Sequence, residues 1–375
     1  MRKITLCIAL VLVISSSLSI YAQLELPAPT GPYAVGQMIL RWVDASRPEV
    51  LTEDPNDVRE MVAVIWYPAE PESGVKEGYF PHLASLSSAM IQSEEVKPWE
   101  VFGLRFIRSE TRFEASPVKN VHPFPVVILS PGNGTNVEFY SVLAGELASH
   151  GYVVVGIDHP YDVPAVALSD GRVVPYDKDQ WSLDAVDHQA YITERIKVRT
   201  GDMVFALENV EELNTEGPFA GLLDLNSVAA AGHSLGGITA SETCKADRRL
   251  GACLNFDGLQ RGGPFSMEET AIPPEQPFLF LTKEARLPPR LLERFETMSE
   301  TYWIVIHGAS HQSFTDGPSL QPTFLPGPNQ ADERMSLIQK YTRAFLDQTL
   351  KEQPNSLLSK STANETVSVN VFPSN

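Results

Sequence analysis

Short apolar runs recur along the chain at intervals that suit an alternation of buried strands and helices. Each run is rich in Val, Ile, Leu, Ala or Phe and has almost no polar interruption. Continuous apolar segments of this kind are typical of strands that are buried on both faces of a largely parallel sheet. The predicted strands are Val62–Tyr67, Pro125–Leu129, Tyr152–Ile157, Val228–Ala231, Ala252–Phe256, Pro277–Leu281 and Tyr302–Ile306.

Longer segments with helical periodicity lie between many of these runs and after the last one. The predicted helices cover about Val137–Ser149, Leu183–Leu213, Gly237–Lys245, Pro289–Ser299 and Ala331–Leu350. Strands that alternate with helices favour an α/β domain over an arrangement in which the two are segregated. The pattern therefore predicts one α/β domain with a mostly parallel central sheet and helices on both faces.

Two segments depart from this alternation. Residues 71–120 are rich in Ser, Pro and Glu, and we expect them to wrap the sheet or to cap a pocket. Residues 259–276 contain a Gly-Gly-Pro sequence and a Pro-Pro pair, which predict an irregular excursion over the functional site.

The two ends of the chain carry different signals. A basic start is followed by the apolar run Ile4–Ile20, which ends near Ala22 in the layout of a cleavable secretory signal peptide. Serines interrupt the run too early for a membrane anchor. Beyond Glu352 the chain is polar and shows no sustained apolar period. We expect a secreted or periplasmic protein with a signal peptide over 1–22, one folded domain over 23–351 and a polar, disordered tail over 352–375.

Charge and cysteine content narrow the range of partners. The formal net charge of −18 argues against nucleic acid as a partner, whereas neutral or zwitterionic lipids remain compatible with it. No cluster of residues has metal-ligand spacing, so we expect neither a metal nor another cofactor. Removal of the signal peptide leaves Cys244 and Cys253, for which a disulfide and two buried thiols are equally open. The sequence leaves the oligomeric state open.

The segment Gly-His-Ser-Leu-Gly-Gly at 232–237 carries the first chemical signal. It follows the predicted strand Val228–Ala231 and precedes a predicted helix. A strand, a sharp turn and a helix in this order expose the serine hydroxyl above the sheet, as in the nucleophile turn of the α/β-hydrolase fold. Glycine at 232 and 236 lets strand and helix pass closely. The motif therefore predicts an α/β-hydrolase fold with Ser234 as the nucleophile.

A general base is expected downstream of the nucleophile in this fold, where the order is serine, acid, histidine. Only His307 and His311 qualify. His307 directly follows the predicted strand Tyr302–Ile306, whereas His311 lies in a loop long enough to bring its imidazole over the sheet edge. We therefore predict His311 as the general base.

The acid is less well defined by the pattern. Asp257 and Glu284 each follow a predicted strand, and either carboxylate could orient an imidazole. Asp316 is a third candidate that is more easily interpreted as a turn residue. Two further histidines, His159 and His233, are expected to support the site or to pack beside it.

The loop after the predicted strand Pro125–Leu129 is a candidate oxyanion hole. It reads Ser-Pro-Gly-Asn-Gly-Thr-Asn, and its glycines allow the backbone to approach a reacting carbonyl. In this fold a backbone N–H from such a loop acts with the N–H of the residue after the nucleophile. The predicted pair of donors is Asn133 and Leu235.

These residues together resemble the platelet-activating factor acetylhydrolases of the secreted, lipoprotein-associated phospholipase A2 type and their bacterial relatives. The resemblance covers nearly the whole chain after the signal peptide. The segments that carry it are Leu26–Gly36, Trp66-Tyr67-Pro68, Leu147–Tyr152, the serine motif at 232–237 and the loop that holds His311.

The resemblance implies a choice between the candidate acids. In that family the acid follows the strand after the nucleophile helix, which corresponds to Asp257, and the histidine lies in a Gly-x-x-His-x-x-Phe loop, matched here by Gly308, His311 and Phe314. Leu235 and Asn133 are again the implied oxyanion donors. One departure is Pro131, where animal members often have histidine, and it bears on the shape of the acyl pocket.

The implied function is a serine ester hydrolase that cleaves short or oxidised sn-2 acyl esters of phospholipids through an acyl-enzyme. Its partners would be a small-molecule ester or a phospholipid, with transient contact with a lipid interface. The alternatives are a general carboxylesterase, or a polyester or dienelactone-type hydrolase, that shares the same site. A secreted binding protein on an inactive hydrolase scaffold is the alternative from a different class.

Overall fold

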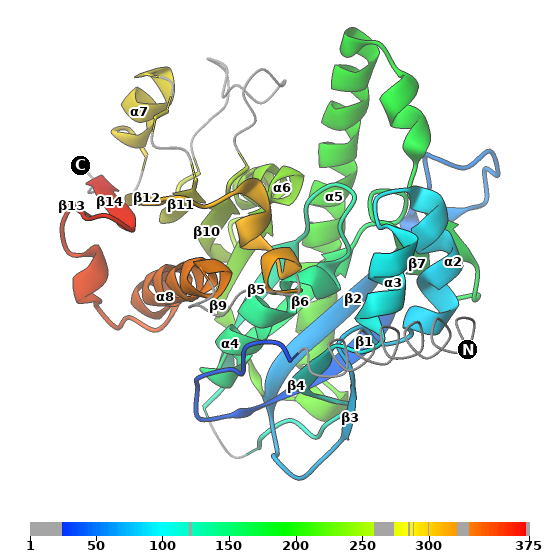
Figure 1. Cartoon of the computed structure of the whole chain (residues 1–375), viewed down its shortest axis with the longest axis horizontal. Helices are drawn as coiled ribbons and strands as arrows, with labels where there is room; N and C mark the ends of the chain where they lie inside the picture. Colours follow the sequence, from blue (N-terminus) through cyan, green and yellow to red (C-terminus); the bar gives the residue numbers. More distant parts are fainter. Residues whose placement is uncertain are drawn as a thin grey trace, which may run out of the picture.

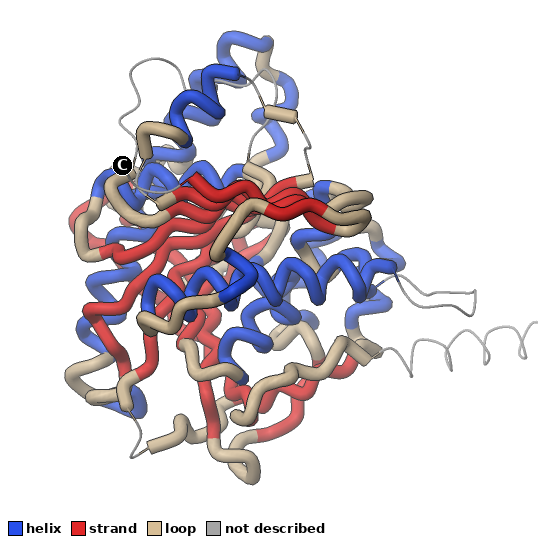
Figure 2. Tube along the Cα trace, turned by 90° about the vertical axis from the view of Figure 1, so that its left-hand side faces the viewer, coloured by secondary structure: helices blue, strands red, loops and turns tan. Residues whose placement is uncertain are grey.

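A twelve-stranded sheet forms the centre of the molecule, with the strand order β13-β14-β12-β11-β10-β9-β5-β6-β2-β1-β4-β3 (Figures 1 and 2). The structure is a computed structural model that describes residues 25–119, 122–258, 274–283, 286–287, 289–298, 300–320 and 330–372. The strands of this sheet are β1 (Ala34–Pro48), β2 (Val58–Ala69), β3 (Val75–Gly78), β4 (Arg108–Phe113), β5 (Phe124–Ser130), β6 (Val153–Asp158), β9 (Leu223–His233), β10 (Leu250–Phe256), β11 (Phe278–Thr282), β12 (Thr301–Ile306), β13 (Thr362–Ala363) and β14 (Val367–Phe372). A separate hairpin pairs β7 (Ala165–Ala167) with β8 (Val173–Pro175).

The middle of the sheet is parallel. Strands β6, β5, β9, β10, β11 and β12 all run in the same direction. On one side β2 and β1 continue the sheet in antiparallel pairing, and on the other side β14 does so. The carboxyl ends of the central strands therefore meet at one edge of the sheet, where ligands bind in open α/β sheets.

Helices cover both faces of the sheet, as expected (Figure 1). Alternate residues of each strand point to opposite faces, so Val127 and Leu129 join one core, and Val126 and Ile128 join the other. The first core includes helices α4 (Ser141–Ser149) and α8 (Gln330–Leu350). The second includes α5 (Ala185–Leu213), α6 (Leu235–Ala246) and α7 (Pro289–Phe295). This arrangement confirms the predicted fold class.

All seven predicted strands are present, within a few residues of their expected bounds. The predicted helix from Val137 begins as the short 3-10 helix η1 (Val137–Tyr140) and continues as α4. Residues 71–120 contribute β3, α2 (Leu83–Ser93), α3 (Pro98–Leu104) and β4. The turn before α3 and α3 itself form one wall of a pocket, in agreement with the expected capping role.

Strand β1 is the longest strand that the sequence pattern does not predict. It pairs with β2 from Ala34 opposite Ala69 to Asp44 opposite Arg59. The second half of β1 along the chain contains exposed polar residues such as Arg41 and Ser46. These residues interrupt the continuous apolar run that marks a strand buried on both faces.

The prediction of a disordered tail over 352–375 is wrong for most of that segment. Strand β14 pairs with β12 from Thr301 opposite Phe372 to Ile306 opposite Val367. Val367 and Val369 are buried, while the residue between them and the residue directly after Val369 are polar. This alternation is the period of a half-buried strand, so the folded domain extends to the last described residues.

Several predictions concern residues outside the described part of the chain. They are the signal peptide over 1–22, most of the excursion over 259–276 and the alternative acid Glu284. Among the described residues, no helix has the length and apolar character needed to cross a membrane.

Candidate active site

A sharp turn at Ser234 joins β9 to α6. Ser234 has φ 54° and ψ −122°, a conformation that L-residues rarely adopt. The turn also brings backbone segments into close contact, because a Cβ on Gly232 would lie 2.1 Å from the Gly236 carbonyl oxygen, and one on Gly236 would lie 2.1 Å from that of Ser130. Strained backbone held by its surroundings in this way is characteristic of functional sites.

The turn brings Ser234 next to the predicted base and acid. Ser234 Oγ lies 2.9 Å from His311 Nε2, and His311 Nδ1 lies 2.7 Å from Asp257 Oδ2. Asp257 follows β10, and His311 begins the short 3-10 helix η4 (His311–Phe314) after β12. Ser234 and Asp257 are buried, whereas the His311 side chain is 34% exposed. The imidazole is therefore the solvent-facing member of this hydrogen-bonded chain.

Asp257 is held as a carboxylate. Its Oδ1 accepts hydrogen bonds from Thr282 Oγ1 at 2.7 Å and from the Lys283 backbone at 3.2 Å. Burial raises the pKa of Asp257, but the hydrogen bonds from His311 and Thr282 and the charge of Lys283 outweigh burial and lower the pKa below its usual value. An ionised carboxylate at Nδ1 favours an imidazole that carries its proton on that nitrogen.

The loop after β5 lies against the start of α6. The Asn133 side chain donates to Tyr176 Oη at 3.0 Å and to Gln180 Oε1 at 3.1 Å. Within the described part of the chain, the backbone N–H groups of Asn133 and Leu235 have no hydrogen-bond acceptor. Two such amides beside a serine are what an oxyanion hole requires.

Buried charges support this loop from below, and the sequence pattern does not reveal them. Arg199 Nη1 donates to the Pro131 carbonyl at 2.9 Å, and the Gly134 amide donates to the Asp162 carbonyl at 2.8 Å. The Asp162 carboxylate accepts from Arg195 and Arg199, both fully buried on α5. The spacing of four residues between these arginines on one helix is the only sequence signal for the cluster.

His159 and His233, the two histidines expected near the site, are both buried. His159 Nε2 lies 2.9 Å from Ser130 Oγ, and its Nδ1 lies 2.8 Å from Asp202 Oδ2. The His233 ring packs beside His311, with the ring centroids 4.5 Å apart. The structure therefore places His159 under the loop after β5, which we call the oxyanion loop, and His233 against the candidate base.

The remaining candidates are not part of the hydrogen-bonded chain of Ser234, His311 and Asp257, which we call the triad. His307 Nε2 is 2.8 Å from Ser368 Oγ of β14. Asp316 is completely buried and accepts from Tyr79 Oη at 2.9 Å and from the Val142 amide at 3.1 Å. Burial raises the pKa of Asp316 to about 7, in spite of these hydrogen bonds. Asp316 thus joins the loop after His311 to the segment that caps the pocket.

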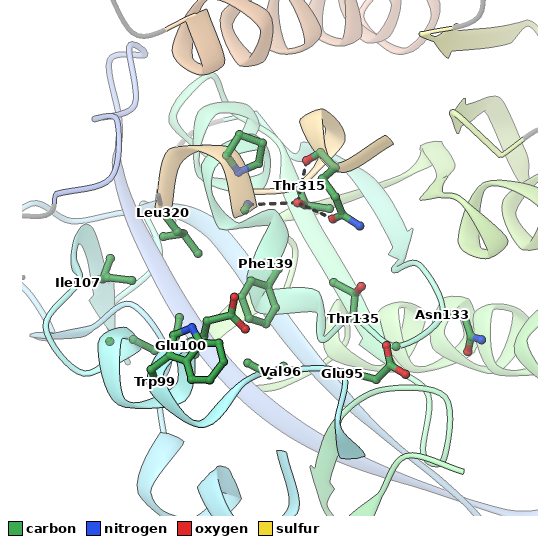
Figure 3. A pocket seen from close by; sticks show the side chains of 16 residues that line it. Glu95, Val96, Trp99, Glu100, Ile107, Asn133, Thr135, Phe139, Thr315 and Leu320 are labelled. Atoms are coloured by element: carbon green, nitrogen blue, oxygen red, sulfur yellow. Dashed lines mark hydrogen bonds between the residues drawn. The ribbon is translucent and has the colours of Figure 1, made fainter. Parts of the chain in front are cut away.

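A pocket of about 560 Å³ lies next to the loops that carry Asn133 and His311, although Ser234, His311 and Asp257 do not themselves line it (Figure 3). Asn133 and Gln312, the residue after His311, line it. Figure 3 shows Glu95 and Thr135 near Asn133, and Trp99 on the far side with Glu100. The apolar lining comes from Val96, Leu104, Ile107, Phe139 and Leu320. A pocket that combines apolar walls with several polar groups suits a small organic or lipid ligand.

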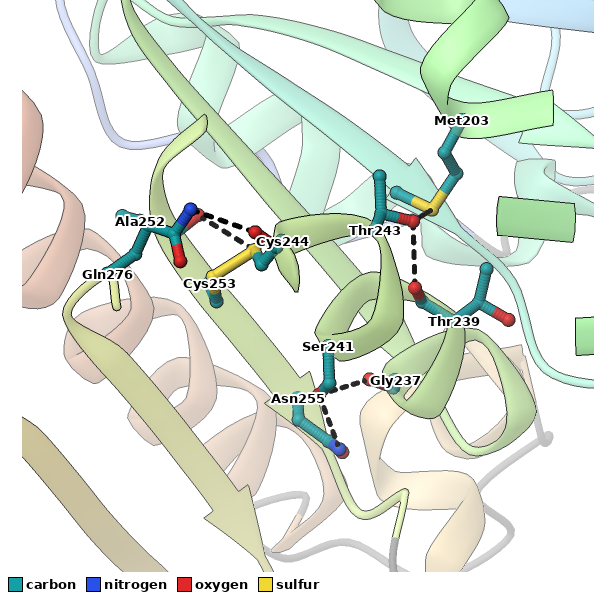
Figure 4. Close-up of a disulfide and its surroundings, with 10 residues drawn as sticks. All are labelled: Met203, Gly237, Thr239, Ser241, Thr243, Cys244, Ala252, Cys253, Asn255 and Gln276. Carbon is teal, nitrogen blue, oxygen red and sulfur yellow. Dashed lines mark hydrogen bonds between the residues drawn. A yellow bond between two sulfur atoms is a disulfide. The ribbon is translucent and has the colours of Figure 1, made fainter. Parts of the chain in front are cut away.

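A disulfide joins Cys244, near the end of α6, to Cys253 of β10 (Figure 4). The sequence left this pairing open. The helix begins directly after Ser234 and the strand ends directly before Asp257. The cross-link therefore connects the two elements that adjoin the candidate nucleophile and the candidate acid.

No group of three His, Cys, Asp or Glu side chains is placed to hold a metal ion among the residues that the structure describes.

The sheet topology and the serine turn between β9 and α6 are those of the α/β-hydrolase class. A ferulic acid esterase from Streptomyces cinnamoneus has a similar structure, with a TM-score of 0.71 and 28% sequence identity over 92% of this chain and 98% of the esterase. A family model described as platelet-activating factor acetylhydrolase, isoform II, matches residues 18–362. The chain belongs to this family.

Individual relatives are similar at modest identity. A probable 1-alkyl-2-acetylglycerophosphocholine esterase of Arthroderma benhamiae is 29% identical over 252 residues, which are 64% of this chain and 60% of the relative. A platelet-activating factor acetylhydrolase of Cavia porcellus is 25% identical over 367 residues, 88% of this chain and 79% of the relative. The chain thus matches less than two thirds of the fungal relative's length.

Proposed function

We propose that this protein is a serine ester hydrolase that cleaves short or oxidised sn-2 acyl esters of phospholipids through an acyl-enzyme. The observation that carries the proposal is the hydrogen-bonded chain from Ser234 through His311 to Asp257 at a strained turn beside a pocket. The names of the relatives support the phospholipid substrate class.

Acylation begins when Ser234 Oγ attacks the ester carbonyl and His311 Nε2 takes the hydroxyl proton. Asp257 keeps the His311 Nδ1–H in place and stabilises the imidazolium that forms. The backbone amides of Asn133 and Leu235 donate to the developing oxyanion, an effect worth about 3 kcal/mol per donor. His311 then gives its proton to the leaving alcohol, which is the lysophospholipid.

Deacylation follows the same route in reverse order. His311 takes a proton from water, the hydroxide attacks the acyl-enzyme carbonyl, and the carboxylic acid leaves as Ser234 regains its proton. The exposed face of the His311 ring supports this step because water can reach it.

The apolar part of the pocket lining supports a substrate with a lipid portion, since it would bury hydrocarbon near the loops that carry Asn133 and His311. A second candidate function is general carboxylesterase activity, or polyester or dienelactone-type hydrolysis, at the same site. The structural similarity to a ferulic acid esterase favours this second candidate.

Secretion or export to the periplasm is part of the proposal. It rests on the apolar run Ile4–Ile20 and its basic start. Transient contact with a lipid interface follows from the proposed substrate.

Hydrolysis of 2-acetyl and 2-palmitoyl glycerophosphocholine by the purified protein tests the substrate class. We expect a strong preference for the acetyl lipid that the Ser234→Ala variant abolishes. Activity on simple aryl esters but on neither phospholipid would support general ester hydrolysis instead. Equal rates on both phospholipids would contradict the preference for short acyl chains.

A further inference from the structure

A buried hydrogen-bonded chain links the oxyanion loop to the ring beside the catalytic histidine. The Gly132 amide donates to Tyr140 Oη at 2.9 Å, and Tyr140 Oη lies 2.9 Å from His233 Nδ1. Tyr140 and His233 are 0% and 2% exposed, respectively. Both side chains are therefore shielded from bulk water.

Both ends of this chain contact the proposed catalytic groups. Gly132 directly precedes Asn133, a proposed oxyanion donor, and His233 directly precedes Ser234. Gly132, His233 and Ser234 pack closely, because a Cβ on Gly132 would lie 3.3 Å from His233 Nδ1 and 3.4 Å from Ser234 Cβ. The His233 ring packs against His311 on one side and stacks on Phe314, with ring centroids 5.9 Å apart.

The protonation states of the pair suit this arrangement. Burial, together with the nearby His311, lowers the pKa of His233 to about 3, so its ring is neutral over the range in which esterases work. Burial also raises the pKa of Tyr140, so its hydroxyl keeps the proton. The hydroxyl can then accept from Gly132 while it donates to the unprotonated Nδ1 of His233.

We propose that Tyr140 and His233 are positioning residues that fix the Asn133 amide relative to Ser234 and His311. This inference rests on the proposed function. Neither side chain needs to touch the substrate. Loss of the tyrosine hydroxyl leaves a buried amide and a buried imidazole nitrogen without partners, which frees the oxyanion loop to shift.

The effect belongs to the transition state, because an oxyanion donor binds charge that develops only there. We expect Tyr140→Phe to lower kcat on 4-nitrophenyl acetate about 10- to 100-fold, with KM changed less than about twofold. The inhibition constant of a trifluoromethyl ketone, which forms an oxyanion adduct with the serine, should rise by a similar factor.

His233 offers a conservative rescue. Asn in its place keeps an acceptor oxygen near the position of Nδ1, whereas Leu of similar size keeps none. We expect His233→Asn to stay within about fivefold of the wild-type kcat and His233→Leu to fall as far as Tyr140→Phe. The double variant of Tyr140→Phe and His233→Leu should be little worse than either single variant, because the two residues act as one unit.

Tyr152→Phe is the matched control. Its hydroxyl donates to Asp347 Oδ1 at 2.7 Å from a buried ring just before β6, at the end of the strand opposite the site. This variant should lose stability but keep kcat and the inhibition constant. Thermal unfolding of every variant establishes that it is folded at the assay temperature.

Wild-type kcat and inhibition constant in Tyr140→Phe, alongside an inactive Ser234→Ala, would overturn the positioning role alone. A loss of kcat with no change in the inhibition constant would overturn it as well. Activity retained by Ser234→Ala would overturn both the proposed function and this inference.

Discussion

Two Ser–His–Asp chains lie in this molecule, and they have nearly the same hydrogen-bond distances. In the first, Ser234 Oγ, His311 and Asp257 are joined by distances of 2.9 and 2.7 Å. In the second, Ser130 Oγ, His159 and Asp202 are joined by distances of 2.9 and 2.8 Å. Only the first lies at a strained turn beside a pocket.

The surroundings of the two chains differ in access and in charge. Ser130, His159 and Asp202 are all 0% exposed, whereas the His311 side chain is 34% exposed. Ser130 ends the regular strand β5. Asp202 also accepts hydrogen bonds from two arginines, Arg59 at 2.7 Å and Arg47 at 2.9 Å.

Hydrogen-bond distances alone therefore do not make a serine a nucleophile. Proton transfer requires an imidazole that a substrate can reach, and charge stabilisation requires free amide donors beside the serine. The buried chain instead joins the end of β5 to α5 and so supports the loop that follows Ser130. We propose that the first chain of residues serves catalysis, whereas the second joins β5 to α5 beneath it.

Replacing the two serines should give the largest contrast. Ser234→Ala removes the proposed nucleophile, and we expect kcat to fall about 10⁴-fold or more. Ser130→Ala removes one buried hydrogen bond, which should cost about 1 kcal/mol of stability and change kcat less than about tenfold. Steady-state kinetics and urea unfolding of both variants measure these effects. A similar loss of kcat in both would contradict the distinction.

Replacing the two aspartates should separate catalysis from stability. Asp257→Asn should lower kcat about 10⁴-fold, because the imidazole is then held in the wrong tautomer. Asp202→Asn leaves the buried Arg59 and the partly exposed Arg47 with one carboxylate fewer, and we expect a loss of about 3–5 kcal/mol in the free energy of unfolding. Chemical denaturation of the two variants, with kcat measured where each is folded, gives the comparison. Equal destabilisation by both substitutions would not fit this account.

The pH dependence of stability should be a smaller effect than the loss of stability on Asp202→Asn. Burial and the charge of Arg199 lower the pKa of His159 to about 4 in the folded protein, although its hydrogen bond to Asp202 opposes this. Between pH 4 and about 6.5 the unfolded chain therefore binds a proton that the folded protein does not. Stability is lost as the pH falls through this window, by up to about 3 kcal/mol.

A His159→Asn variant isolates this contribution. Its unfolding free energy should change less steeply than that of the wild type between pH 6.5 and 4, because the substituted residue does not titrate. Urea unfolding at several pH values gives both slopes. Identical slopes would show that His159 does not take up a proton on unfolding.

The sequence predicts the central part of the fold, and it marks Ser234 and His311 as candidate nucleophile and base, for a physical reason. Interior parallel strands are buried on both faces, so each appears as a short continuous apolar run. The turn at Ser234 needs glycine on both sides, and glycine is visible in a sequence. Strands β1 and β14 lie outside the parallel centre of the sheet and carry partly or fully exposed polar residues, so they lack that run.

The buried charged residues that support the candidate site could not be predicted in the same way. Arg59, Asp162 and Asp202 come from distant segments, and a charged residue is ordinarily expected at the surface. Asp316 is similar, since it precedes glycine like a turn residue but is buried against Tyr79. Asp257 and Glu284 each follow a strand, so the pattern alone does not separate them, and Glu284 lies outside the described residues.

Covalent labelling with a fluorophosphonate, followed by peptide mass spectrometry, tests most directly whether only one of the two Ser–His–Asp chains is a catalytic site. The reagent reacts with serines that are activated by a neighbouring imidazole and served by an oxyanion hole. The account predicts a single adduct on Ser234 with loss of esterase activity, and a much slower reaction in Asp257→Asn. An adduct on Ser130, or full inactivation without modification of Ser234, would contradict it.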